Sequence, residues 1–312
     1  MQESVLYTID SLYREPMQIK GYCFGNVSEK TLCIMGALRG NEVTQMYVCA
    51  KLVKVLKKLE ESGQIAQDVG IMVVPCANYY SMNIDKRFWP MDNSDINRMF
   101  PGYSLGETTQ RIAEGIFRNV QGYEYAVQLA SFYQSGKFLT HVKHMMTSFT
   151  NKDGLSDFGL PYAVERDPRP YDTTTLNYNW QLWDTKAYSL FTQSTDDLDD
   201  NAAIQAVDAI LRFMNKRKII RYKINPGFVT TIVRENEMIQ LHCPCGGLCR
   251  TKADVGELVQ KGEIIAEILD PFTCETKAQV KAAEDSVIFY ETASPLAVEG
   301  TVIFKLIKNE TH

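Results

Sequence analysis

The chain lacks both the basic excess and the long apolar runs that would direct it to nucleic acid or to a membrane. Its 33 lysines and arginines stand against 38 aspartates and glutamates, which gives a net charge of −5 over 312 residues. No stretch approaches the ~20 apolar residues of a membrane-spanning helix. Residues 1–4 do not begin a basic and then apolar secretory signal. We therefore expect a cytoplasmic protein with neither nucleic acid nor a membrane as partner.

Histidine is scarce, and the cysteines are widely spread. The four histidines stand at positions 141, 144, 242 and 312, so a site that needs imidazole has few candidates. The eight cysteines stand at positions 23, 33, 49, 76, 243, 245, 249 and 274, which is too sparse for a disulfide-built scaffold of this length. Most of them are predicted to be reduced and buried.

What the sequence does contain is an alternation of strand-like and helical segments. Strands are predicted at 31–36, 71–75 and 187–192, and helices at 41–61, 105–119 and 200–216. A polar and aromatic segment, residues 78–102, shows neither period and is predicted to be a functional loop. This pattern is typical of an α/β fold with a mixed sheet flanked by helices.

From about Tyr222 the character changes to short strands separated by turns. We predict an α/β domain over 1–221 and a smaller all-β domain over 222–312. The second domain resembles the half-barrel of biotinyl and lipoyl carriers, but it lacks the lysine between two methionines that carries the prosthetic group.

Three motifs in the first domain carry a family resemblance. Residues 36–42 read Gly-Ala-Leu-Arg-Gly-Asn-Glu; residues 75–78 read Pro-Cys-Ala-Asn, with Arg87 after them; and residues 95–102 read Asp-Ile-Asn-Arg-Met-Phe-Pro-Gly. In this order and spacing they resemble the succinylglutamate desuccinylase and aspartoacylase family of zinc-dependent hydrolases. The resemblance implies a zinc-carboxypeptidase-like fold, and it extends to residues 157–161 and to the C-terminal β-domain.

In that family two histidines and a glutamate hold zinc, which lowers the pKa of a bound water toward 7. A separate glutamate moves protons, and arginines hold the substrate carboxylate through paired donors. Against this pattern the present sequence keeps only Glu42 of the metal ligands. Arg39 stands at the first histidine position, Ala130 at the second, and Gln193 at the general-base position.

These replacements predict a degenerate zinc site, a pseudoenzyme, with no cofactor and no confident catalytic residue. Arginine cannot deprotonate to bind a metal, alanine has no donor atom, and glutamine cannot accept a proton at working pH. We expect Arg39 to pair with Glu42 instead.

The positions that hold substrate in the family are kept at Arg87, Asn97 and Arg98. We expect them to converge with Arg39 on a cleft for a small carboxylate-bearing molecule or an acyl-amino acid. The alternative is that Arg98 pairs with a nearby acid such as Asp95 and has a structural role. The sequence does not indicate the oligomeric state.

An active metal-dependent hydrolase, a deacylase or carboxypeptidase with a rearranged zinc site, remains the alternative function. His141 and His144 are spaced to share one helical face and could join Glu42. A second candidate site is the group His242, Cys243, Cys245 and Cys249, although reduced cysteines in a glycine turn explain that segment too. A purely structural role for the fold is the third hypothesis. The acidic run 196–200 is interpreted as a helix N-terminus rather than a calcium loop.

Overall fold

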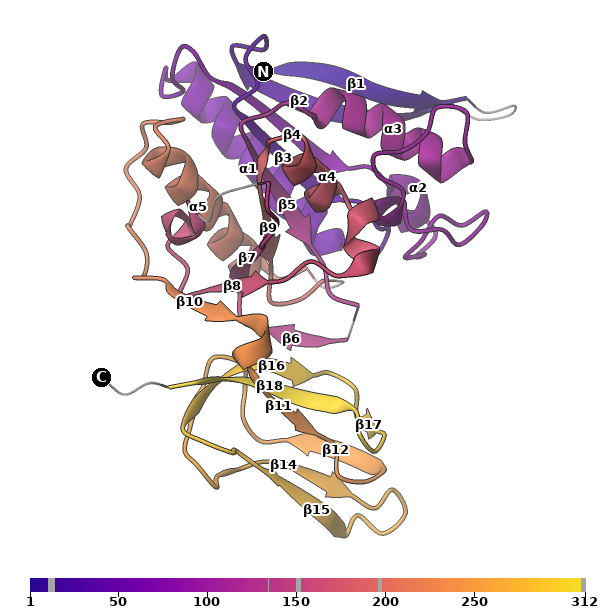
Figure 1. Cartoon of the computed structure of the whole chain (residues 1–312), viewed down its shortest axis with the longest axis vertical. Coiled ribbons are helices and arrows are strands. Elements are labelled where there is room, and N and C mark those ends of the chain that lie inside the picture. Colours follow the sequence, from indigo (N-terminus) through magenta and orange to yellow (C-terminus); the bar gives the residue numbers. More distant parts are fainter. Residues whose placement is uncertain (11–14, 134, 150–152, 196–197, 310–312) are drawn as a thin grey trace. The chain divides into compact units, whose positions relative to one another are not determined.

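A computed structural model describes residues 1–10, 15–133, 135–149, 153–195 and 198–309 (Figure 1). The chain divides into two units, the first comprising residues 1–131 and 140–232 and the second residues 132–139 and 233–312. The division at 232/233 comes later than the predicted boundary near Tyr222, and the segment 132–139 was not expected in the second unit.

The first unit is built on one mixed sheet. Its strands run in the spatial order β1-β2-β4-β3-β5-β9-β7-β8-β10, and neighbours from β4 to β9 are parallel. The strands are β1 (Gln2–Ile9), β2 (Met17–Gly25), β3 (Leu32–Ala37), β4 (Gly70–Cys76), β5 (Tyr125–Ala130), β7 (His141–Met145), β8 (Tyr162–Arg166), β9 (Lys186–Phe191) and β10 (Thr231–Arg234). This confirms the predicted α/β class.

Helices cover both faces of this sheet. They are α1 (Val43–Glu61), α2 (Tyr79–Met82), α3 (Thr108–Val120), α4 (Leu176–Leu182) and α5 (Asp200–Lys216), with short 3-10 turns η1 (Ile96–Arg98), η2 (Leu155–Phe158) and η3 (Pro170–Thr174). The central strand β3 is buried throughout, which explains its unbroken apolar sequence. Its Ile34 packs into a core with α1 and α5, whereas Cys33 and Met35 pack into a second core with α3 and α4. Successive side chains of a strand point to opposite faces, so one strand contributes to both cores.

The second unit consists of antiparallel strands around a smaller core. One sheet has the order β11-β18-β16-β13, with β6 paired to β16, and another has the order β15-β14-β12-β17. The strands are β6 (Gly136–Phe138), β11 (Ile239–His242), β12 (Gly247–Thr251), β13 (Leu258–Val259), β14 (Ile264–Leu269), β15 (Thr276–Lys281), β16 (Ser286–Thr292), β17 (Leu296–Ala297) and β18 (Val302–Lys308), with the turn η4 (Glu235–Glu237). The all-β character of this unit is as predicted.

None of the helices in the described part of the chain has the length and apolar character that crossing a bilayer requires.

Three parallel strands of the first unit, β3, β5 and β9, lie next to one another and end at the same edge of the sheet. In open α/β sheets, ligands bind outside the carboxyl ends of the strands. Ser131 and Thr192 follow β5 and β9 directly, and Arg39 comes two residues after β3. The fold therefore brings Arg39 to the same edge as the predicted positions Ala130 and Gln193, which neighbour Ser131 and Thr192.

Candidate functional site

Glu42 is buried at the turn between β3 and α1. It occupies the N-cap position of α1, yet its side chain does not cap that helix. Its Oε2 instead accepts hydrogen bonds from the backbone N–H groups of Leu38, at 2.8 Å, and Arg39, at 3.0 Å. The turn thus folds around its own carboxylate, and Oε1 is directed to the side chains of Arg39 and Ser131.

The Arg39 guanidinium lies between two carboxylates. Its Nη1 is 3.1 Å from Glu42 Oε1, and its Nη2 is 2.9 Å from Asp95 Oδ2. Nε also donates to both oxygens of Asp95, at 3.1 and 3.2 Å. The side chains of Arg39 and Glu42 are only 4% and 2% exposed, so this is a buried ion-pair network. The expected pair of Arg39 with Glu42 is confirmed, whereas the contact with Asp95 was not foreseen.

Ser131, directly after β5, joins this network to Arg87. Its hydroxyl donates to Glu42 Oε1 and accepts from Arg39 Nη1 and Arg87 Nη2, both at 3.4 Å. Arg87 Nη1 donates to Asn41 Oδ1 at 3.0 Å. Ser131 was not among the residues expected at the site, and its place after a strand end was the only signal in the sequence that pointed to it.

Gly40 lets the long segment 78–102 lie against this turn. A Cβ at this position would come within 2.1 Å of the Lys86 carbonyl oxygen and 2.6 Å of the Met82 nitrogen, both backbone atoms. The Gly40 N–H donates to the carbonyl of Arg87 at 2.9 Å. The close backbone approach that glycine permits therefore fixes where Arg87 stands.

Arg98 and Asn97 make their contacts elsewhere in the first unit. Arg98 Nη1 donates to the Tyr171 carbonyl at 2.9 Å, and its guanidinium lies 5.1 Å from the centre of the Tyr171 ring. The Asp172 carboxylate lies 3.9 Å from Arg98 Nη1. Asn97 Oδ1 accepts from the backbone N–H of Leu176, the first residue of α4, at 3.1 Å. These contacts attach η1 to the segment before α4. They do not direct Arg98 to the group around Ser131.

The two remaining family positions stand at the ends of β5 and β9. The Ala130 carbonyl accepts from Gln45 Nε2 at 3.2 Å, and the same amide donates to Thr192 Oγ1 at 3.4 Å. Gln45 on α1 thereby links the two strand ends. Gln193 follows Thr192 and is half-buried.

The residues at the family's metal positions do not supply a zinc donor set. Zinc sites take nitrogen, sulfur or carboxylate ligands, usually three or more from the protein. Here Glu42 is the one retained donor, and both of its oxygens already accept hydrogen bonds. The guanidinium of Arg39 holds a positive charge beside it.

The rearranged site with His141 and His144 is not supported by the fold. Both residues lie on strand β7 rather than on a helix, and a separation of three on a strand places them on opposite faces. His141 stacks on Phe191, whereas His144 lies beside the Tyr188 ring. Over the described residues, no three His, Cys, Asp or Glu side chains are grouped to hold a metal.

The second candidate cluster, His242, Cys243, Cys245 and Cys249, is likewise not grouped to hold a metal. His242 Nδ1 is 2.8 Å from the Gly300 carbonyl oxygen, and Cys243 Sγ donates to the Cys245 carbonyl at 3.0 Å. Burial raises the pKa of the Cys243 and Cys249 thiols, so the protonated form is favoured. A thiolate is what a metal binds.

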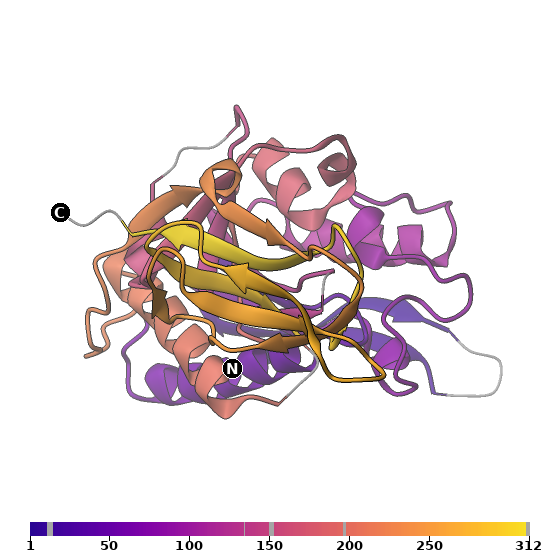
Figure 2. The same ribbon diagram turned by 90° about the horizontal axis from the view of Figure 1, so that it is seen from below.

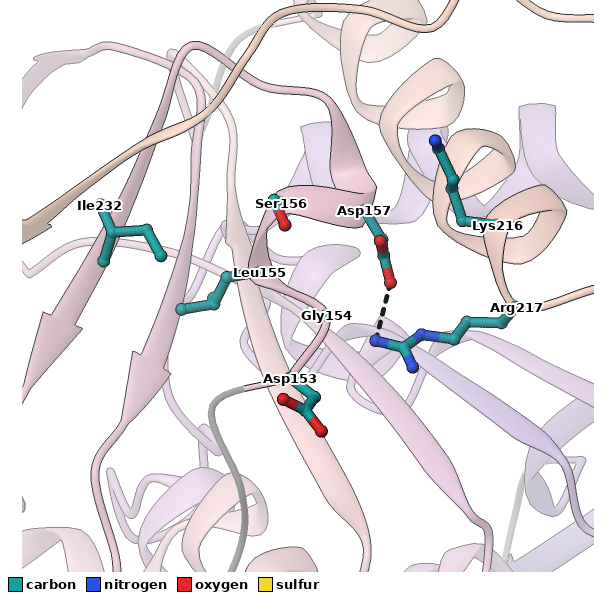
Figure 3. Close-up of a pocket in the computed structure, with 8 residues that line it drawn as sticks. All are labelled: Asp153, Gly154, Leu155, Ser156, Asp157, Lys216, Arg217 and Ile232. Carbon is teal, nitrogen blue, oxygen red and sulfur yellow. Dashed lines mark ion pairs between the residues drawn. The ribbon is translucent and has the colours of Figure 1, made fainter.

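A pocket of about 450 Å³ in the first unit lies between η2 and the end of α5 (Figure 3). Its polar groups include Asp157 and Arg217, which form an ion pair (dashed line in Figure 3) with 2.7 Å between Arg217 Nη2 and Asp157 Oδ2. The Arg217 guanidinium also lies over the rings of Tyr125 and Phe213. These contacts explain Arg217 as a structural residue that holds η2 against α5.

Comparison with known proteins decides the family. The model of the succinylglutamate desuccinylase/aspartoacylase catalytic domain matches residues 28–184. The chain belongs to the succinylglutamate desuccinylase/aspartoacylase family. The matched segment contains Arg39, Glu42, Arg87, Asp95 and Ser131, and it ends before Gln193.

Solved structures similar to this family member cover nearly all of it. A product-bound structure of the ectoine utilization protein EutE (DoeB) from Ruegeria pomeroyi has a TM-score of 0.78 at 16% identity, covering 99% of this chain and 95% of the other. A succinylglutamate desuccinylase from Silicibacter sp. TM1040 has a TM-score of 0.78 at 18% identity, covering 98% and 95%. An aspartoacylase family protein from Mesorhizobium loti has a TM-score of 0.73 at 18% identity, covering 95% and 91%. No curated protein matches. At these identities the likeness establishes the fold.

Proposed function

We propose that this member of the family does not carry out zinc-dependent hydrolysis and instead binds a small carboxylate or acyl-amino-acid ligand. The observation that supports this is the Arg39 guanidinium bonded to both Glu42 and Asp95. A permanent cation in contact with the one retained metal ligand opposes a dication electrostatically. It also satisfies the carboxylate that the metal would need.

The proposed ligand site centres on Arg87 rather than on Arg39. Two carboxylates already face the Arg39 charge, so it adds no net positive field for a ligand. Arg87 donates to Asn41 and Ser131, in the turns that follow β3 and β5, and thus stands at the strand ends beside the Arg39 network. A guanidinium carries five N–H donors in a fixed fork, which permits it to hold Asn41 and a ligand carboxylate together. Arg98 is retained as a second candidate.

The test is a calorimetric titration of the full chain with succinate and with N-acetyl-aspartate. We expect binding that weakens with added salt and that is lost in Arg87→Ala. Arg118→Ala is the matched control, because Arg118 is an exposed arginine on α3 whose acid contact is Glu114, at 3.9 Å. Arg98→Ala is measured alongside, and a larger loss there than in Arg87→Ala would move the site to η1.

Two outcomes would overturn the proposal. Hydrolysis of an N-acyl amino acid by the unmodified protein, abolished by a chelator, would establish the rearranged hydrolase instead. Equal titrations of the unmodified protein, Arg87→Ala and Arg118→Ala, with no heat attributable to binding, would leave a structural role for the fold.

A further inference from the structure

A row of three polar residues crosses the middle of the first unit's sheet. Gln128 on β5, Ser189 on β9 and Lys143 on β7 are paired in register on neighbouring strands. Residues paired in this way point to the same face of a sheet, and adjacent strands lie about 4.8 Å apart. The row therefore brings an amide, a hydroxyl and an ammonium group within the reach of one small ligand.

The row lies on the face of the sheet that α4 covers, opposite to the face covered by α1 and α5 (Figures 1 and 2). Asn177 of α4 donates from Nδ2 to Ser189 Oγ at 3.2 Å, which identifies the side. Ala126, two residues before Gln128, belongs to the core on this side. Side chains two apart on a strand share a face, so Gln128 points the same way.

Gln128 is a buried polar residue whose amide has no partner. It stands in the buried part of β5 and is only 4% exposed. Among the described residues its amide takes part in no hydrogen bond. Buried polar groups are almost always bonded to protein, to ordered water or to a ligand, and leaving one without a bond costs free energy. This exception therefore points to a ligand that supplies the missing partner.

Ser189 and Lys143 are half-buried although their strands lie inside the sheet. Strands β7 and β9 have a neighbour on each side, and apart from Lys186 at the start of β9 their other residues are buried. The Ser189 hydroxyl accepts from Asn177, and its own proton has no acceptor among the described residues. A hydroxyl donor and an ammonium thus stand beside the Gln128 amide where solvent reaches the sheet.

The Lys143 ammonium extends toward the strand ends of the candidate site. Its Nζ lies 5.0 Å from the centre of the ring of Phe191, the last residue of β9. Phe191 is paired in register with Ala130, and Ser131 follows Ala130. Ser131 Oγ is 3.4 Å from Arg87 Nη2. The two cations, Lys143 and Arg87, therefore adjoin the neighbouring ends of β9 and β5.

We propose that Gln128, Ser189 and Lys143 form an anion subsite that holds one of two negatively charged groups of the ligand, while Arg87 holds the other. The amide, the hydroxyl and the ammonium each offer a hydrogen-bond donor, and an anionic oxygen accepts such bonds more strongly than a neutral one. The need for a second charge rests on the proposed function, because Arg87 is taken as the first anchor. The ligand is then a small dianion, and Lys143 sets the preference for it over a monoanion.

The experiment is a calorimetric titration of the full chain with glutarate and with its monoamide, which has the same length and one negative charge fewer. We expect glutarate to bind about tenfold more tightly, the effect of one charge-assisted contact. Lys143→Met should lower the affinity for glutarate to that for the monoamide and leave the monoamide unchanged. Lys143→Arg should retain part of the preference, since it keeps the charge.

Gln128→Met separates a binding role from a structural one. It removes the amide at nearly constant volume, so glutarate binding should weaken while the free energy of unfolding, measured by chemical denaturation, stays equal or rises. A residue with only a structural role would lose stability instead.

Lys186→Met is the matched control. Lys186 begins β9 at the opposite edge of the sheet, and its ammonium also lies over a ring, 5.1 Å from the centre of Tyr125. Glutarate binding should be retained in this variant, and an equal loss in Lys186→Met and Lys143→Met would overturn the proposal.

The variants distinguish a failure of this subsite from a failure of the proposed function. Glutarate binding that is lost in Arg87→Ala but is indifferent to Lys143→Met and Gln128→Met would overturn the subsite and leave the proposed function in place. Binding that depends on Lys143 and not on Arg87 would keep the subsite and overturn the assignment of Arg87. Equal affinities of the unmodified protein for glutarate and the monoamide would overturn the subsite, and no binding of either would overturn both proposals.

Discussion

At the scale of single residues, Arg39 is the centre of the candidate site. Its guanidinium contacts Glu42 in its own turn, Asp95 in the segment 78–102 and Ser131 after β5. These three segments are far apart in the sequence. A planar group with five donors can bridge them at once, which the compact ammonium of lysine cannot do in the same geometry.

Replacing Arg39 by alanine should lower the free energy of unfolding by about 3–5 kcal/mol, because two carboxylates would be left buried without their cation. Arg39→Lys should recover part of the loss. Chemical denaturation monitored by circular dichroism measures both variants. Arg118→Ala, at an exposed position of α3, should stay within about 0.5 kcal/mol of the unmodified protein. If Arg39→Ala loses no more unfolding free energy than the control Arg118→Ala, water compensates the two carboxylates for the lost guanidinium.

The sequence predicts part of this network and not the rest. Arg39 and Glu42 are three residues apart in one turn, so local geometry suffices to pair them. Asp95 lies 56 residues from Arg39, and only the folded path of the segment 78–102 brings it to the guanidinium. The same limit explains why Asp95 was considered as a partner of Arg98, its neighbour in sequence, whereas the contact of Arg98 with Tyr171 was not foreseen.

At the scale of elements, apolar periodicity located the central strands and the long helices. The predicted helix 200–216 matches α5, and the predicted strands at 31–36 and 71–75 match β3 and β4 within one residue at each end. The assignment of His141 and His144 to one helical face was wrong for a physical reason. Both residues of β7 are buried in a sheet covered on two faces, so the strand shows no alternation of polar and apolar residues.

Asp199 caps the N-terminus of α5, in agreement with the interpretation of the acidic run 196–200 as a helix N-terminus. Its Oδ1 accepts from the N–H groups of Asn201, at 2.9 Å, and Ala202, at 3.0 Å. Asp196 and Asp197 lie outside the described residues. Asp199→Ala should cost about 1 kcal/mol of unfolding free energy, whereas Asp199→Asn should cost little. Thermal unfolding of both variants, with the exposed Asp68→Ala as control, tests this. Equal midpoints for the alanine and asparagine variants would contradict the capping role.

Strands β12 and β14 are joined by a charged cluster, from which we expect the second unit to lose stability in acid. Glu267 lies opposite Arg250 in the ladder and pairs with both Arg250 and Lys252. These hydrogen bonds hold the pKa of Glu267 below its usual value. A carboxyl group whose pKa is lower in the folded state stabilises the folded protein at pH values above its unfolded-state pKa. That stabilisation is lost as the pH falls through the folded-state pKa.

We therefore expect Glu267→Gln to reduce stability at neutral pH. The difference should begin to shrink near pH 4.3, about where an unperturbed glutamate takes up its proton, and should vanish only below the lowered folded-state pKa. Denaturation midpoints measured across pH 3 to 7 give the comparison. Glu237→Gln on η4, an exposed position, is the control. A constant difference between Glu267→Gln and the unmodified protein at every pH would show that packing rather than charge is responsible.

At the scale of the whole molecule, one feature of the division into two units can be predicted from the sequence and another cannot. The shift to short β-strands is visible in the sequence, although the division falls at 232/233. The membership of 132–139 in the second unit is not visible there. Its strand β6 has three residues, and it pairs with β16 through Phe138 and Tyr290, 152 positions later in the chain. A three-residue strand has no period to detect.

Metal should not contribute to the stability of the whole molecule if the proposal for the first unit is right. A ligand that binds only the folded state raises the unfolding midpoint. We expect scanning calorimetry to give the same midpoint, within about 1 °C, with chelator and with equimolar zinc. The double variant Cys243→Ser with Cys249→Ser controls for zinc bound by thiols. A rise with zinc that persists in this double variant and disappears in Glu42→Gln would contradict the proposal.

The placement of β6 also sets an order of events during synthesis. The ribosome makes residues 132–139 early, but their partner β16 is made only after the whole remainder of the first unit. Until then the nascent chain carries β6 as a strand without its neighbour, held at both ends by segments that belong to the first unit. The second unit can close only when the last strands emerge, so a stalled or prematurely terminated chain would expose an unfinished sheet.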